Sequence, residues 1–251
     1  MSWRGARPRG DHRLMKIACC AAFLFASTNA CADSLHPPQD AAAEYARVAA
    51  IPPAAGCDGG SLLELDVEPG EGGIASAYDA ATGVMRVRYP MAFNQVTEGW
   101  NWHPEARGDE DYYVFKYVPL KSVVEERPGY RGEDKIGAPQ DFAVRWRYDY
   151  FFAFDNADDF YARGAADAGF GTEFAASQED AGRLAARDLR MALDVRLAPP
   201  CTSDSTTFWK ATHDKPVDFT LKKRYLMGKL ESVTFYDAAT GHVLARLARK
   251  P

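Results

Sequence analysis

The sequence predicts an α+β fold with a predominantly antiparallel β-sheet, a sandwich or partly closed barrel as the variant, and two or three short helices. Three observations predict it. Apolar and polar residues alternate in many short segments, which is typical of strands with one buried face. Turn-forming residues separate these segments. Few segments combine helical composition with a capping residue at the start.

The clearest strand signal runs from Val144 to Asp155. One set of alternating positions is apolar throughout, while the other set begins polar and becomes apolar at Phe151. We therefore expect a central strand whose first half has one wet face and whose second half is covered on both sides. Further strands are expected at residues 63–67, 85–93, 113–118, 189–197, 217–227, 230–236 and 243–247.

Two helices are expected. Asp40 is placed to cap an alanine-rich segment that ends before Pro52, and Ser177 begins a capping pattern for a short helix to about Arg187. A continued helix is the alternative for residues 189–197. Pro199-Pro200 is expected to end that element, because proline cannot donate to a strand ladder.

Loops and turns complete the prediction. A long polar loop is expected over residues 201–216, and a turn at Gly228-Lys229. The phrase Tyr-Asp-Ala-Ala-Thr-Gly occurs at residues 78–83 and again at 236–241. Its aspartate can accept turn N–H groups and its glycine can take a positive φ, so we expect two hairpin turns rather than a repeat.

Residues 1–32 have the layout of a cleavable signal peptide. Met15-Lys16 supplies a positive start, residues 17–26 are apolar, and Ala30 and Ala32 are small residues at the −3 and −1 positions. The basic residues before Met15 are either a long positive region or lie upstream of the true start, and a start at Met15 is favoured. After cleavage, residues 33–39 are expected to be a tether and residues 40–251 a single globular domain.

Export predicts whether the cysteines of the mature chain are reduced or disulfide-bonded. Only Cys57 and Cys201 remain after cleavage, and in an oxidising compartment they are expected to form a disulfide. Closing a loop of this length contributes roughly 5 kcal/mol in the chain-entropy model. The predicted location is the periplasm or the extracellular space. Lipidation of Cys31 is a minor alternative.

Charge and hydropathy argue against a nucleic-acid partner and against a membrane-spanning segment. The whole chain has a formal net charge of −5, which argues against binding nucleic acid. No apolar run reaches the roughly 18 residues of a spanning helix, so no transmembrane segment is predicted in the mature chain. No phosphate loop and no zinc-ligand spacing are present in the sequence, so no cofactor and no metal are predicted.

The strongest candidate for ligand contact is the segment 99–113. It combines aromatic rings with a carboxylate cluster, which suits sugars or peptides and also suits acid/base groups for glycoside cleavage. The alternative is that the rings cover a sheet edge and the acids solvate a loop. The candidate ligand-binding residues are Trp100, Trp102, His103, Asp109, Glu110 and Asp111.

Two other groups of polar residues are weaker candidates for a functional site. Asp155, Asp158 and Asp159 resemble calcium ligands, but Ala157 breaks the calcium-loop pattern, so a helix start is favoured. A Ser/His/Asp arrangement from Ser203 or Ser205, His213 and Asp214 lacks a nucleophile elbow and is expected by chance.

These observations predict an exported protein of a bacterial envelope, a non-catalytic binding or interaction module whose partner is a glycan or an envelope protein. One alternative is a hydrolase of glycan or cell wall that uses carboxylates of the 103–111 loop. Another is a structural assembly subunit that pairs through a sheet edge.

Overall fold

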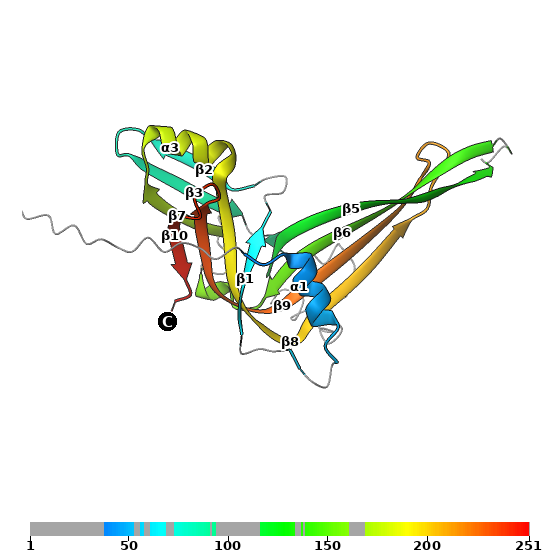
Figure 1. Ribbon diagram of the computed structural model, residues 1–251, viewed down its shortest axis with the longest axis horizontal. Helices are drawn as coiled ribbons and strands as arrows, with labels where there is room; N and C mark the ends of the chain where they lie inside the picture. The colour runs from blue at the N-terminus through cyan, green and yellow to red at the C-terminus, as the bar shows by residue number, and fades with distance from the viewer. Residues whose placement is uncertain are drawn as a thin grey trace, which may run out of the picture. The chain divides into compact units, whose positions relative to one another are not determined.

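The computed structural model describes residues 38–52, 56–57, 61–68, 73–90, 92–93, 116–133, 137, 139–160 and 169–250. These residues are mostly β-strand and form two open sheets (Figure 1). The strands are β1 Leu62–Val67, β2 Ala75–Asp79, β3 Val84–Pro90, β4 Ala92–Phe93, β5 Lys116–Glu133, β6 Pro139–Phe154, β7 Gly169–Ala175, β8 Leu189–Trp209, β9 Val217–Asp237 and β10 Val243–Ala248. The helices are α1 Ala41–Ala49 and α3 Gln178–Arg183, with a 3₁₀ turn at Ala157–Asp159 and a π turn at Leu184–Asp188.

The larger sheet has the strand order β1-β8-β9-β6-β5-β4, and β10 also pairs with β9. The smaller sheet has the order β2-β3-β7. Neighbouring strands are antiparallel except for β6 and β9, which are parallel. The prediction of an antiparallel system therefore holds for every described pair but this one, which depends on a crossover between strands far apart in the chain.

Strand β6 matches its predicted pattern. It lies between β9 and β5, and all four residues from Phe151 to Phe154 are buried, whereas Arg145 and Arg147 are exposed. The first half of the strand therefore faces solvent on one side, and the second half is covered on both sides, as expected.

Strand β8 corrects two expectations. The strand does not end at Pro199-Pro200, and residues 201–209 continue it instead of forming a loop. The ladder is interrupted between Leu197 and Thr202, which oppose Gly228 and Leu226. The prolines lie in this bulge, where a missing N–H costs no ladder hydrogen bond. The helical alternative for residues 189–197 is wrong.

Strand β9 corrects a third expectation. Residues 217–237 form one strand, with no turn at Gly228-Lys229. A Cβ at Gly228 would lie 2.0 Å from the carbonyl oxygen of Arg196. Glycine is therefore needed here for the close approach of β8, not for a turn.

The repeated hexapeptide forms two hairpin turns, as expected. One joins β2 to β3 and the other joins β9 to β10. In each turn the aspartate, Asp79 or Asp237, accepts a hydrogen bond from a backbone N–H two residues later, at 2.9 Å. Each ends in a glycine of positive φ, +68° at Gly83 and +71° at Gly241.

Both predicted helices are present. Asp40 caps α1 by accepting hydrogen bonds from the N–H groups of Ala42 and Ala43. Ser177 caps α3 by accepting one from the N–H of Asp180. No helix among the described residues is long and apolar enough to cross a membrane.

The main core includes apolar side chains from both sheets. Leu65 and Leu193 of the larger sheet belong to the same buried cluster as Met85 and Phe170 of the smaller one. Cys57 and Cys201, the predicted pair, are joined beside this cluster with an S–S distance of 2.10 Å. The bond links residues 144 positions apart, so it ties the segment before β1 to the bulge of β8.

Candidate functional site

Four strands of the larger sheet continue past the main core. We call this part the arm: residues 121–133 of β5, 139–150 of β6, 202–209 of β8 and 217–225 of β9 (Figure 1). Because side chains alternate along each strand, the arm presents two faces. One carries Trp146 and the other carries Arg145.

Cations cover the indole on the Trp146 face. The guanidinium carbon of Arg127 lies 4.6 Å from the Trp146 ring centroid, and the Lys222 ammonium lies 3.7 Å from it. These residues come from β5 and β9, on either side of β6. Cation–π contacts of this kind stabilise an exposed sheet face, and they occupy the ring that a ligand would need.

The Arg145 face holds an open groove at the end of the arm, with a volume of about 620 Å³. Trp209 and Phe219 form its aromatic floor, with ring centroids 5.5 Å apart. They are directly opposed in the β8–β9 register, which explains their contact. The indole of Trp209 remains 49% exposed. The tip groove is lined by Arg145, Trp209, Lys210, Thr212, Lys215, Val217 and Phe219.

Basic side chains surround this aromatic floor. Arg145, Lys210 and Lys215 line the groove, and no carboxylate is among the lining residues that the structure describes. Arg145 is held by Glu126 at 2.6 Å. Among the residues that the structure describes, no carboxylate forms an ion pair with Lys210 or Lys215, and both lysines line the groove.

The loop that carries the lysines is fixed at both ends. The carboxylate of Asp218 accepts a hydrogen bond from the N–H of Ala211 at 2.6 Å and one from the Tyr130 hydroxyl at 3.1 Å. Burial and this second hydrogen bond raise the pKa of Tyr130. Thr212 and Lys215 exchange two backbone hydrogen bonds, at 2.9 and 3.2 Å. The groove is therefore built on an anchored strand end.

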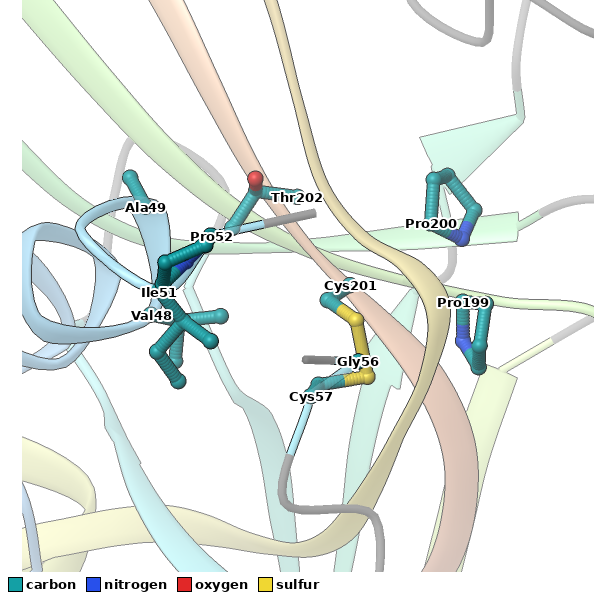
Figure 2. A pocket seen from close by; sticks show the side chains of 10 residues that line it. All are labelled: Val48, Ala49, Ile51, Pro52, Gly56, Cys57, Pro199, Pro200, Cys201 and Thr202. Carbon is teal, nitrogen blue, oxygen red and sulfur yellow. A yellow bond between two sulfur atoms is a disulfide. The ribbon is translucent and has the colours of Figure 1, made fainter. Parts of the chain in front are cut away.

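A second cavity, of about 500 Å³, lies beside the disulfide. Figure 2 shows the disulfide with the end of α1, including Val48 and Ile51, on one side of it and the prolines of the β8 bulge on the other. None of its described lining residues is titratable. It offers apolar contact without a group that would orient a ligand.

The candidate ligand residues of the sequence analysis, Trp100 to Asp111, lie outside the described residues, as does the predicted signal peptide. Asp155 forms an ion pair with Lys229 at 2.5 Å. The side chain of Asn156 makes no capping hydrogen bond to the 3₁₀ turn and instead exchanges two hydrogen bonds with the backbone of Leu230. No described group of three or more His, Cys, Asp or Glu side chains is arranged to hold a metal ion.

The Ser/His/Asp arrangement is not assembled. His213 and Asp214 are neighbours in the exposed tip loop, 3.4 Å apart. Ser203 and Ser205 lie in β8 opposite Tyr225 and Lys223. Six and four residues of strand, roughly 20 and 13 Å, separate them from Trp209 at the strand end, so neither hydroxyl meets the histidine in the loop beyond it.

The tip groove was missed by sequence reasoning because residues 201–216 were expected to form a loop. A local signal was present, since Thr206, Thr207, Phe208 and Trp209 are all residues that favour strands. No family model, curated protein or solved structure matches the chain.

Proposed function

We propose that the chain is an exported, non-catalytic binding module that holds an acidic glycan in the tip groove. The observation that carries the proposal is the half-exposed indole of Trp209 among three basic side chains. The C–H face of a sugar packs on an aromatic ring, and carboxylate, sulfate or phosphate substituents pair with guanidinium and ammonium groups.

The lining favours binding over cleavage at this groove. Glycoside hydrolysis ordinarily needs two carboxyl groups about 5–10 Å apart across the scissile bond. The described lining residues supply cations, aromatic rings, a threonine and a valine. The alternative of a glycan hydrolase therefore draws no support from this groove.

Two features support export. Cys57 and Cys201 are joined across most of the chain, and such bonds persist in oxidising compartments. The leader-like composition of residues 1–32 agrees with this location.

The test is a titration of the exported chain with polygalacturonate and, separately, with neutral dextran, followed by calorimetry. We expect binding to the acidic polymer only, and a loss of at least tenfold in affinity for Trp209→Ala. The matched control is Phe208→Ala, which removes the neighbouring aromatic, 56% exposed, from the opposite face. Equal effects of the two variants, or binding of dextran alone, would contradict the proposal. Release of new reducing ends would contradict its non-catalytic part.

A further inference from the structure

Over residues 202–209, β8 has a described strand on one edge only. One edge of this segment pairs with β9, and no strand among the described residues pairs with the other. Its sequence, Thr-Ser-Asp-Ser-Thr-Thr-Phe-Trp, contains no lysine, no proline and a single charge. An exposed edge of this composition is a template for another strand.

The opposite edge of the arm is protected. Strand β5 carries consecutive charges from Glu125 to Arg127, followed by Pro128. The ladder is irregular between Arg127 and Tyr130. A Cβ at Gly129 would lie 2.5 Å from the carbonyl oxygen of Phe142. Charges, proline and a bulge are the usual protection of edges. Over residues 202–209, β8 has no proline and no bulge, and its only charge is Asp204.

The single charge on the β8 edge is already neutralised within the chain. The carboxylate of Asp204 accepts a hydrogen bond from Arg224 of β9 at 2.8 Å. Arg224 lies directly opposite in the β8–β9 register, away from the open edge. A second strand on that edge therefore meets no uncompensated charge.

We propose that β8 pairs with β8 of a second copy of this chain, antiparallel, with the two-fold axis at Ser205 or Thr206. An axis at Ser205 sets Asp204 opposite Thr206 of the second copy, and an axis at Thr206 sets it opposite Phe208. In neither register does Asp204 meet its own counterpart. The same patch thus serves both copies, as a two-fold interface requires, and serine and threonine pairs are favourable across strands.

The pairing joins the two arms into one continuous sheet. Its two-fold axis is perpendicular to the sheet, so both tip grooves open on the same face. Trp209 lies three or four residues from the axis in each copy, which places the two indoles about 20–27 Å apart. If the tip groove binds a glycan as proposed above, one polymer chain then spans two grooves and gains avidity. The pairing itself does not depend on the glycan.

The test uses the exported chain, oxidised and without ligand, in sedimentation experiments with Ser205→Pro and Thr206→Pro. Successive N–H groups of a strand point to opposite edges. One of the two substitutions therefore removes an N–H that points away from β9 and leaves the hydrogen bonds between β8 and β9 intact. We expect the wild type to dimerise with rising concentration. We expect one proline variant to keep the wild-type circular dichroism and to be monomeric. Val123→Pro and Val124→Pro on the protected β5 edge are the matched controls, and the one that keeps the wild-type circular dichroism is expected to leave the dimer intact.

A cross-link supplies a second measurement that tolerates a loss of stability. Only a cysteine on the two-fold axis faces its own counterpart, so mild oxidation is expected to give a covalent dimer for one of the two variants Ser205→Cys and Thr206→Cys, the one whose cysteine lies on the axis. Val124→Cys is expected to give none. A wild type that stays monomeric at about 100 μM, far above a micromolar dissociation constant, would overturn the proposal. So would a dimer that survives in the folded proline variant, because the interface would then lie elsewhere.

Discussion

Arg183 holds the carboxylate of Asp237 with two hydrogen bonds, 3.0 Å from Nη1 to Oδ1 and 2.7 Å from Nη2 to Oδ2. The same guanidinium donates to Asp188 at 2.8 Å. These contacts tie α3 and the turn after it to the hairpin between β9 and β10. The hydrogen bonds from Arg183 lower the pKa of Asp237 to about 2, against the opposing effect of burial.

This pair predicts an acid-labile contribution to stability. Because the folded pKa of Asp237 lies below its unfolded value, the contribution is present above about pH 4 and is lost as pH falls through about 2. Asp237→Asn is therefore expected to lower the melting temperature near neutral pH by about 2–4 °C. The difference from wild type should shrink towards pH 2. Melting curves across this range test it, and a difference independent of pH would show that the charge is not involved.

The disulfide predicts a redox-dependent stability. Reduction of the bond between Cys57 and Cys201 is expected to cost about 2–5 kcal/mol, since it frees a loop of 144 residues in the unfolded chain. Urea unfolding with and without dithiothreitol measures this. A double Cys57→Ser, Cys201→Ser variant should resemble the reduced protein and should no longer respond to the reductant.

The close approach of β8 and β9 predicts that a larger residue at position 228 lowers stability. Gly228→Ala is expected to destabilise the chain by about 1–3 kcal/mol, because its methyl group would collide with the backbone of Arg196. Gly182→Ala is the control: this glycine lies in α3, and an added Cβ would meet nothing within 4 Å, so alanine should be neutral or stabilising. Equal denaturation midpoints for the two variants would refute the steric argument.

The basic rim of the tip groove predicts salt-sensitive binding. Lys210→Ala combined with Lys215→Ala is expected to weaken polygalacturonate binding by about tenfold at low salt and to flatten its dependence on sodium chloride. The aromatic contact of Trp209 should persist in this variant. Titrations at several salt concentrations measure both effects. A salt dependence that the two substitutions leave unchanged would place the anion contact elsewhere.

Local chemistry made some elements predictable. The capping positions of Asp40 and Ser177 and the two hairpin turns follow from hydrogen bonds within a few residues. The change along β6 from one covered face to two is visible in its alternation, because burial sets which side chains are tolerated. Each of these features is decided by neighbours in the chain.

The other predictions were wrong because the features they concern depend on contacts between segments far apart in the chain. Proline and glycine suggested that β8 ends at Pro199-Pro200 and that β9 turns at Gly228, because both residues usually interrupt strands. In the fold Gly228 opposes Leu197, the prolines lie in the irregular step of the ladder that follows, and both strands continue. Neither residue alone indicates this, since each is explained only by its partner strand.

The sequence by itself determined a β-rich fold, helices with capping residues, two hairpin turns of the same sequence, and one pair of cysteines after the leader-like segment. Hydrogen bonding within short segments and the alternation of burial are sufficient to specify these. Only the tertiary structure decided that β6 and β9 run parallel and that Trp209 meets Phe219 in a groove that three basic side chains also line. Strand pairing over long separations brings these groups together, and its register is set by the packing of whole faces rather than by any local pattern.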